Sequence, residues 1–348
     1  MTKKKKIVVL GGSGYIGTQL CELYKNETHK YNITVIDNRF ISERVKQLNE
    51  WGMRFIQGSI LDEKLMKEQL KDCDFCFHLA GQTVVPSTKS DSNPEWDKQI
   101  IETGTKGSKI VIDSMGPNCK IIFPSTHVVF EGLKETVYDI DENHETCPVL
   151  SYSKSKVETE EYLKSLSDKN YIILRLSSAY GIVHDSSSMR LNVLPNLFAK
   201  MTSQGQTLKL YSKGVQLKSL VSINDICRSM KFFMSQTEIK REIFNISNEN
   251  MTIKQLSELC QKIKPSIEII ETNDKIPNLG YSMDNSKLKN TGFSFQSNIE
   301  DELREMINYW SFDKKKMNNS KVYSKKEEFE MNKLISPDPH MGGGIIID

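Results

Sequence analysis

The sequence predicts an α/β fold, with a doubly wound parallel sheet followed by a smaller C-terminal α/β lobe. Short apolar runs alternate with longer amphipathic stretches through the first half of the chain. Consecutive apolar residues are typical of strands that helices cover on both faces of a parallel sheet. After Gly181, glycines and polar runs separate isolated helical patterns, which indicates a second, smaller unit.

Each expected element follows from its periodicity. Ile16, Leu20 and Leu23 recur on one helical face, whereas Ile7 to Leu10 form a continuous β-forming run. The expected strands span residues 7–10, 33–36, 54–56, 75–79, 120–123 and 171–176. The expected helices span residues 15–24, 63–70, 95–115 and 153–166, then 192–201, 223–233, 252–262 and 299–309 in the second unit.

Composition excludes several classes of protein. The 348 residues include 47 Lys+Arg and 45 Asp+Glu, and the resulting net charge of +2 gives no support for nucleic-acid binding. No apolar run is long enough for a membrane helix, and the run at residues 7–10 is too short for a signal peptide. The 7 cysteines are dilute and odd in number, which favours reduced thiols. We therefore expect a soluble cytoplasmic protein without a metal site.

Three glycines follow the first expected strand and open the first helix. Gly11, Gly14 and Gly17 have the spacing G-x-x-G-x-x-G. A tight turn needs a residue without Cβ, a pyrophosphate needs close backbone approach, and the helix must pack near its strand. The helix N-terminus then offers free N–H groups to the anion. An ordinary glycine-rich turn is the alternative interpretation.

An acidic residue at the end of the second expected strand favours a dinucleotide. Asp37 can accept hydrogen bonds from both hydroxyls of an adenosine ribose, and it would repel a 2′-phosphate. NAD is therefore favoured over NADP. Arg39 leaves NADP open, because an arginine can accommodate that phosphate.

Tyr152 and Lys156 form a Y-x-x-x-K motif, so on a helix they share one face. A tyrosine is a poor base at its free pKa of about 10, and a neighbouring ammonium favours the phenolate. Such a phenolate can take a proton from a hydroxyl while the attached carbon gives up hydride. The alternative is that both residues are surface neighbours on a charged helix.

Taken together, these motifs resemble the extended short-chain dehydrogenase/reductase family, the nucleotide-sugar epimerases and dehydratases. The resemblance covers residues 6–310. It also includes the stretches Pro124–Phe130, His78–Gln82, Leu174–Leu176 with Tyr180 and Gly181, and Phe244–Ile246.

The resemblance implies a Rossmann-type NAD-binding domain at 1–181 and a substrate-binding lobe at 182–310 with some return to the first domain. Residues 311–348 are charged and have no clear periodicity, so we expect a partly disordered tail there. The resemblance also implies a nucleotide-diphosphate sugar as partner and a homodimer formed through helices 95–115 and 153–166. The implied catalytic residues are Thr126, Tyr152 and Lys156. The implied cofactor-binding residues are Gly11, Gly14, Tyr15, Ile16, Gly17, Asp37, Asn38, Ser59, Ile60, Leu79, Ala80, Gly81, Tyr152 and Lys156, and the implied substrate-binding residues are Thr126, Tyr152, Ser178, Asn192 and Lys218.

The residues after Thr126 discriminate between the reactions of the family. Its 4,6-dehydratases carry an Asp-Glu pair where this chain has His127 and Val128, and its sugar-acid decarboxylases carry a Glu in the place of Val128. Valine cannot transfer protons, so we expect an epimerase, acting at C4 by transient oxidation to a keto sugar and hydride return. A keto-sugar reductase is the alternative, because residues 125–132 have the spacing of the reductase loop S-T-D-x-V-F-D-G, with His127 as an extra acid. A third hypothesis is a nucleotide-sensing regulator without catalysis.

Several family positions depart from the pattern. Ser178 stands where an Asn is usual, Lys218 and Tyr281 stand where Arg is usual, and Ile101 stands where another Asn is usual. Lys218 keeps a positive charge but lacks the fork with which Arg binds phosphate. These departures concern the sugar and the nucleotide rather than the hydride transfer.

Overall fold

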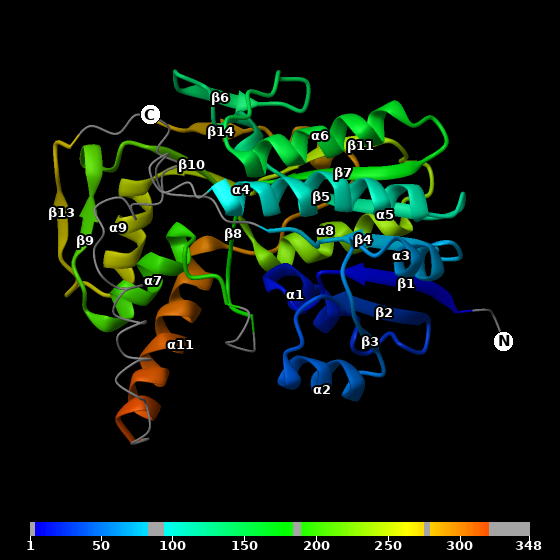
Figure 1. The fold of residues 1–348 in the computed structure, drawn as a ribbon. Helices are drawn as coiled ribbons and strands as arrows, with labels where there is room; N and C mark the ends of the chain where they lie inside the picture. The colour runs from blue at the N-terminus through cyan, green and yellow to red at the C-terminus, as the bar shows by residue number, and fades with distance from the viewer. Residues whose placement is uncertain (1–3, 83–93, 184–188, 275–278, 320–348) are drawn as a thin grey trace.

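The computed structural model describes residues 4–82, 94–183, 189–274 and 279–319. Its centre is a seven-stranded parallel sheet with the strand order β11-β7-β5-β4-β1-β2-β3 (Figure 1). The strands are β1 (Lys5–Leu10), β2 (Tyr31–Asp37), β3 (Arg54–Gln57), β4 (Phe75–His78), β5 (Lys120–Thr126), β7 (Asn170–Leu176) and β11 (Glu242–Ile246). The predicted doubly wound parallel sheet is therefore confirmed.

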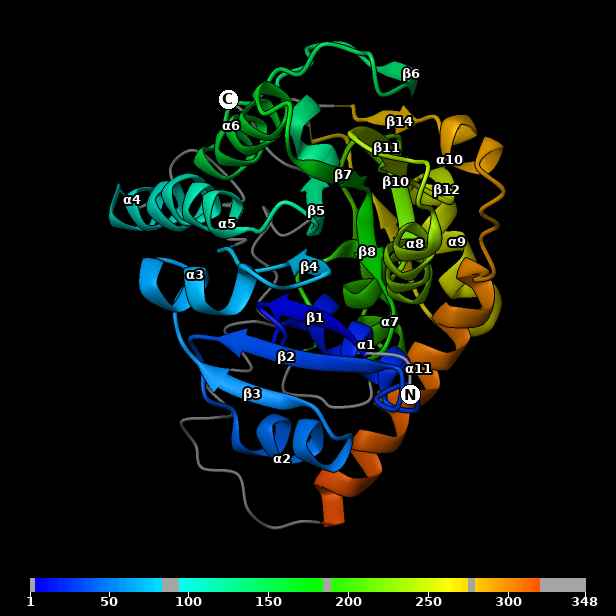
Figure 2. The same cartoon turned by 90° about the vertical axis from the view of Figure 1, so that its right-hand side faces the viewer.

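Helices cover both faces of this sheet (Figure 2). Neighbouring strand residues point to opposite faces, so Val9 packs with α1 and α8 while Val8 packs with α3 and α5. One face carries α1 (Tyr15–Tyr24), α2 (Ser42–Glu50) and α8 (Ile223–Ser235), and the other carries α3 (Glu63–Leu70), α5 (Ser108–Ser114) and α6 (Ser151–Ser165). This two-sided burial explains why the strands lack a polar alternation.

The helix predicted at 95–115 is interrupted by a π-helical segment. It consists of α4 (Pro94–Ile101), the π-segment η2 (Glu102–Gly107) and then α5. A Cβ on Gly104 would lie 2.6 Å from the Ser155 hydroxyl, and the Thr159 hydroxyl donates to the Gly104 carbonyl over 3.1 Å. The glycine thus allows α6 to approach the π-segment closely.

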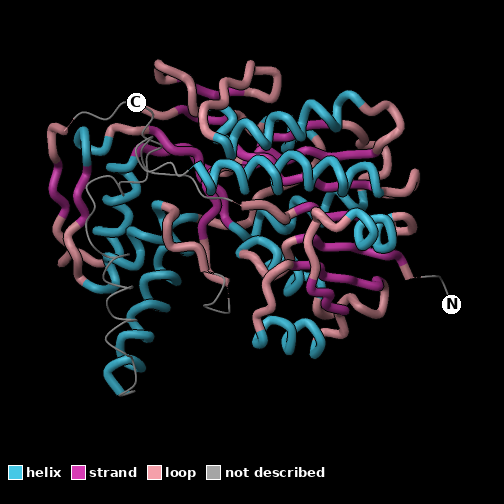
Figure 3. Tube along the Cα trace, in the orientation of Figure 1, coloured by secondary structure: helices cyan, strands magenta, loops and turns pink. Residues whose placement is uncertain are grey.

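The second lobe has its own apolar core, in which Phe198, Leu256 and Leu303 are buried. Figure 3 shows this lobe beside the parallel sheet. Its helices are α7 (Leu194–Gln204), α9 (Ile253–Ile263) and α11 (Ile299–Asn319), whereas α10 (Ser286–Asn290) packs on β11 of the parallel sheet. Its strands are β8 (Ser178–Tyr180), β9 (Leu208–Leu210), β10 (Leu217–Ser222), β12 (Glu249–Thr252) and β13 (Ile269–Glu271), while β14 (Tyr281–Met283) pairs with β6 (Val137–Ile140).

The chain crosses between the two units more than once. β8 and β10 belong to the second lobe, but α8 packs on α1, and β11 returns to pair with β7. Helix α11 continues beyond its predicted end at residue 309 to Asn319, and the rest of the expected tail lies outside the described residues. Within the described ranges, no helix combines the length and the apolar character that crossing a bilayer requires.

Candidate active site

The glycine motif lies where β1 ends and α1 begins, beside the end of β4. Gly11 has a φ of +79°, and a Cβ at this position would lie 2.7 Å from the backbone nitrogen of Ala80. A Cβ on Gly17 would lie 2.5 Å from the Gly11 carbonyl oxygen. Only glycine therefore allows the turn and the close packing of helix on strand.

The N-terminus of α1 fits a bound pyrophosphate. Gly14 is its N-cap and has no side chain with which to cap the first N–H groups. The ends of β3 and β4 bring Ser59, Ile60, Leu79, Ala80 and Gly81 to the same edge of the sheet. Parallel α/β sheets bind ligands at this edge, so the predicted cofactor residues are brought together.

Asp37 ends β2 and is 5% exposed. Its carboxylate accepts hydrogen bonds from the backbone nitrogens of Ser13 and Arg39, each over 3.0 Å. The Arg39 side chain lies against the same carboxylate, with Nε at 3.5 Å. Asp37 thus ties the glycine loop to β2 and holds Arg39 beside the position where a ribose would bind.

Tyr15 has a second role that the motif did not predict. Its hydroxyl donates to the Gly181 carbonyl over 2.7 Å and accepts a hydrogen bond from the Asn196 side chain at 3.3 Å. These bonds connect the glycine-loop helix to the second lobe.

The three expected catalytic residues lie at the junction of β5 and α6. Thr126 is the last residue of β5, and Tyr152 and Lys156 are one turn apart on α6. Thr126 and Tyr152 share a side-chain hydrogen bond. The Thr126 oxygen also accepts from the Val128 backbone nitrogen at 3.1 Å, which leaves the Thr126 hydroxyl proton available for donation.

Lys156 is fixed to the end of β5 by its ammonium group. Its Nζ donates to the Pro124 carbonyl over 2.7 Å and lies 4.5 Å from the centroid of the Phe123 ring and 5.9 Å from that of Tyr152. Burial lowers the pKa of Lys156 to about 8, while nearby Glu160 opposes that shift.

The pKa of Tyr152 is raised above its ordinary value rather than lowered. Burial is the main cause and the Glu131 carboxylate adds to it, while Arg190 and the Thr126 hydrogen bond act in the opposite direction. Desolvation therefore outweighs the neighbouring cations within the protein. Any additional cation beside the phenol would favour its ionised form.

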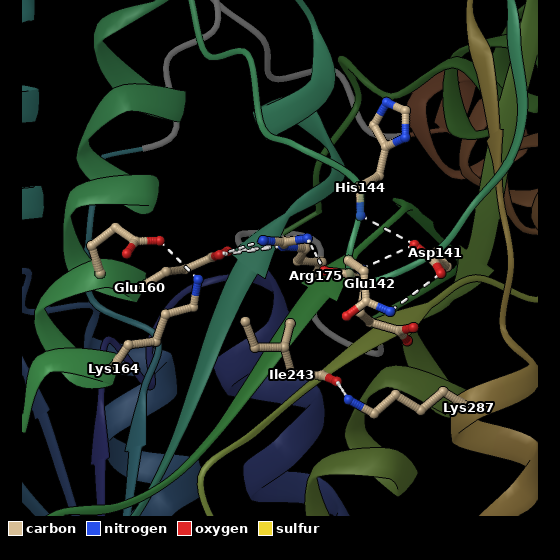
Figure 4. Close-up of polar contacts among 10 residues, drawn as sticks. Asp141, Glu142, His144, Glu160, Lys164, Arg175, Ile243 and Lys287 are labelled. Carbon is tan, nitrogen blue, oxygen red and sulfur yellow. Dashed lines mark hydrogen bonds and ion pairs between the residues drawn. The ribbon is translucent and has the colours of Figure 1, made fainter. Parts of the chain in front are cut away.

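A buried ion pair anchors α6 to the sheet (Figure 4). Glu160 and Arg175 of β7 are both at most 2% exposed, and Arg175 Nη2 lies 2.8 Å from a Glu160 oxygen. Arg175 also donates to the Glu142 carbonyl over 3.1 Å and stacks on Phe130 at 5.3 Å. One guanidinium therefore joins α6, β7 and the turn after Thr126.

On the substrate side, His127 is held by two residues of the second lobe. Its Nδ1 lies 2.9 Å from the Tyr281 hydroxyl, which itself donates to the His127 carbonyl, so Nδ1 carries the proton. Its Nε2 therefore accepts from the Ser178 hydroxyl, at 3.2 Å. Burial, with Lys218 and Arg190 nearby, lowers the pKa of His127 to about 3. A neutral imidazole with both nitrogens engaged is a poor acid, contrary to its suggested role in a reductase.

Two cations lie near His127. Burial lowers the pKa of Lys218, on β10, to about 8, and no acidic side chain among the described residues pairs with it. Arg190 acts electrostatically on both Tyr152 and His127, and its Nε donates to Asn192 over 2.9 Å. The predicted Ser178 and Lys218 thus both lie near His127, whereas Asn192 is exposed and accepts a hydrogen bond from Arg190. No sequence pattern singled out Arg190.

Comparisons with known proteins agree with this geometry. Residues 7–247 match the model of the NAD dependent epimerase/dehydratase family. The chain is 28% identical over 268 residues to UDP-N-acetyl-alpha-D-glucosaminuronate decarboxylase from Bacillus cytotoxicus, which spans 75% of this chain and 79% of that relative.

Two solved epimerases share the fold. UDP-N-acetylglucosamine 4-epimerase from Methanobrevibacter ruminantium, in complex with UDP-N-acetylmuramic acid, aligns with a TM-score of 0.74 and 24% identity over 90% of this chain and 100% of its own. UDP-glucuronic acid 4-epimerase from Bacillus cereus, in complex with UDP-glucuronic acid and NAD, aligns with a TM-score of 0.73 and 20% identity over 88% and 98%.

The resemblance noted in the sequence and its implied cofactor, NAD, are therefore confirmed at the level of the family. The match covers the glycine loop, the Thr126 strand end and the Tyr152 helix. By this match the chain belongs to the NAD dependent epimerase/dehydratase family.

Proposed function

We propose that the protein is a nucleotide-sugar 4-epimerase. The observation that carries this proposal is the arrangement after β5, where Thr126 contacts Tyr152 while the next two positions hold a neutral His127 and a Val128. Thr126, Tyr152 and Lys156 lie at the junction of β5 and α6, which supports hydride transfer, but the two places that serve dehydration or decarboxylation in the family lack a proton-transferring group. Epimerisation needs the triad alone.

Each residue of the triad has a defined task. Tyr152 takes the proton of the sugar hydroxyl, and the Thr126 hydroxyl donates to the same oxygen as negative charge develops there. Lys156, held by Pro124, binds the nicotinamide ribose and stabilises the phenolate. NAD, when bound, would supply the hydride acceptor and donor for the reaction. Lys218 and Arg190 bind the diphosphate.

The experiment is a panel of UDP-, GDP-, CDP- and dTDP-sugars incubated with the full chain and NAD, followed by NMR detection of a C4 isomer. We expect Tyr152→Phe to reduce turnover by about 10²-fold or more while NAD binding is retained. Tyr138→Phe is the control, because Tyr138 is 69% exposed. Full turnover by Tyr152→Phe would reject the mechanism.

A keto-sugar reductase is the second candidate, because Glu131 and Gly132 complete the spacing of the reductase loop. That function predicts stoichiometric oxidation of NADH or NADPH when a 4-keto sugar nucleotide is added, with no isomer formed from ordinary sugar nucleotides. A regulator would bind NAD and convert none of these compounds.

Asp37 supports NAD over NADP in the proposed reaction. Its buried carboxylate stands at the end of β2 and would repel a 2′-phosphate, although Arg39 lies against it. Mass spectrometry of material released from the purified protein tests this choice, and NADP in that material would contradict it. The thiols of all seven cysteines are free, which supports a reducing compartment, the cytoplasm.

A homodimer through α4 and α6 is part of the proposal. These helices pack side by side, and α4 exposes two large apolar side chains, Trp96 at 49% and Ile101 at 46%. Light scattering should give twice the chain mass for the wild type and a monomer for Ile101→Glu. A monomeric wild type would contradict this part of the proposal.

A further inference from the structure

Helix α6 begins without a capping residue of its own. Its N-cap position is Leu150, whose side chain has no hydrogen-bond acceptor. Tyr152 is the second residue of this helix, so its position depends on how the N-terminus is held. The backbone donors just before α6 must find an acceptor elsewhere.

Glu131 supplies that acceptor from the other side of the site. Its side chain is buried, and one carboxylate oxygen accepts from the backbone nitrogens of Val149 at 2.8 Å and Leu150 at 2.6 Å. The Ser153 hydroxyl, within the first turn of α6, contacts the same oxygen. Three donors thus converge on one anionic atom at the N-terminus of the helix.

Glu131 is also rigidly connected to Thr126. The 3-10 turn η3 (His127–Phe130) begins where the Thr126 side chain caps the Val128 nitrogen, and it ends where the Glu131 nitrogen donates to the Val128 carbonyl over 3.0 Å. Two backbone bonds join the turn to the segment before α6, from Gly132 to the Cys147 carbonyl and from Cys147 to the Val129 carbonyl.

From these contacts we propose that Glu131 is a positioning residue whose carboxylate fixes the start of α6 to the Thr126 turn and so sets the Thr126–Tyr152 contact. The inference rests on the proposed function, since it concerns the same phenol. Its two parts are separable, because the acceptor oxygen positions the helix and the negative charge acts on the phenol.

The charge has identifiable neighbours. The Glu131 charge interacts with Lys154 of α6, with Cys147 of the preceding segment and with Tyr281 of β14. Glu131 raises the pKa of Tyr152, whereas Arg190 and the hydrogen bond with Thr126 lower it. Burial raises the pKa of Glu131, but it is ionised throughout the alkaline range in which a phenol titrates. Removing the charge should therefore make Tyr152 easier to ionise.

The test is an NMR titration of the full chain with ¹³C-labelled tyrosine, in the presence of NAD. The Tyr152 signal is identified by its loss in Tyr152→Phe. In Glu131→Gln, which keeps an acceptor oxygen and removes the charge, we expect this signal to titrate at lower pH than in the wild type. Glu158→Gln is the matched control, because Glu158 is exposed on the same helix. An unchanged Tyr152 titration in Glu131→Gln would refute the part of the proposal in which the Glu131 charge acts on the phenol.

A second measurement uses the wild type alone and decides the matter if Glu131→Gln does not fold. The amide ¹⁵N signals of Val149 and Leu150 should shift together as the Glu131 carboxyl titrates. Amides that do not respond over the acidic range would show that the cap is absent and overturn the proposal. Neither measurement needs a sugar substrate, so failure of the epimerase assay leaves their outcome unaffected.

Turnover separates positioning from charge. Glu131→Ala also loses the acceptor oxygen, so we expect kcat to fall about tenfold or more. The affinity for NAD should be unchanged, because the glycine loop that would bind NAD lies elsewhere, between β1 and α1. Glu131→Gln should retain most of kcat and shift only the pH profile. Equal turnover in Glu131→Ala and the wild type would refute the positioning role.

Discussion

The ammonium group of Lys156 donates a 2.7 Å hydrogen bond to the carbonyl oxygen of Pro124, two residues before Thr126 on β5. This bond crosses from α6 to the sheet and places the cation above the Phe123 ring. A carbonyl acceptor leaves the positive charge unneutralised, in contrast to a carboxylate partner. The ammonium therefore remains available to an anionic or hydroxyl group of a ligand.

Replacement of Lys156 by Met should remove this cation and little of the packing. We expect turnover to fall by about 10²-fold or more and the affinity for NAD to fall as well, because the same ammonium serves the phenolate and the ribose. Kinetics and calorimetric titration with NAD measure the two effects. Lys164→Met, an exposed change on the same helix, is the control. Wild-type turnover in Lys156→Met would contradict the proposed role of this lysine.

The glycines of the first turn should differ in their tolerance of alanine. At Gly17 the added Cβ would lie 2.5 Å from backbone atoms, whereas at Gly14 its nearest neighbour would lie at 3.3 Å. We therefore expect Gly17→Ala to destabilise the fold by about 2 kcal/mol or more. Gly14→Ala should melt close to the wild type but bind NAD more weakly, since it lies at the start of α1. Equal melting temperatures for the two variants would contradict this ranking.

The sequence identified the elements whose signal is local. The helix predicted at 63–70 is found as α3 with the same bounds, because its apolar residues recur at helical spacing. Helix α2 was not predicted, since its buried positions are only Arg44 and Leu48. Strand β5 continues beyond its predicted end because Pro124, Ser125 and Thr126 pair with β7. Of these three residues, only Thr126 is a strong strand former, so the local sequence did not predict the extension.

The residues of the candidate site also fall into those that a local pattern predicts and those that only the fold brings together. Fixed spacings identified Gly11, Gly17, Tyr152 and Lys156. The ring of His127 is instead fixed by Tyr281 and Ser178, which β14 and β8 bring together from distant parts of the chain. No local pattern encodes such a contact, so the sequence left the protonation of this imidazole open.

We expect Lys218 to lower the stability of the folded protein and to raise its affinity for UDP. Its ammonium is buried deeply enough for its pKa to fall to about 8 from an ordinary 10.5. Lys218→Met removes this desolvated charge, and we expect the free energy of unfolding near neutral pH to rise by about 1 kcal/mol or more. The affinity for UDP should fall about tenfold or more, because a cation of the proposed diphosphate site is lost.

Urea unfolding and calorimetric titration with UDP measure these two effects. Lys289→Met is the control, since Lys289 is exposed on α10. The folded-state pKa of Lys218 lies below its unfolded value, so the penalty is present below about pH 8 and is relieved between about pH 8 and 10.5. The stability difference between Lys218→Met and the wild type should shrink over that range. Unaltered UDP affinity would remove Lys218 from the proposed diphosphate site.

His127 should destabilise the protein in acid without contributing to proton transfer. Its folded pKa of about 3 lies below the ordinary 6.5, so the unfolded state binds the proton first as the pH falls. Stability due to this group is therefore complete above about pH 6.5 and is lost toward pH 3. Relative to His127→Gln, the wild type should lose about 1–2 kcal/mol between pH 7 and pH 4.5, after allowance for its partial exposure.

Unfolding curves at several pH values, with the exposed His29→Gln as control, measure this difference. A glutamine side chain can hydrogen-bond to Ser178 or Tyr281 but cannot donate a proton to a reacting oxygen. His127→Gln should therefore keep turnover within about tenfold of the wild type and keep both limbs of the pH profile. Loss of the alkaline limb together with most of the turnover would mean that the imidazole is protonated during the reaction, as a reductase acid would be, and would reverse the choice between the two functions.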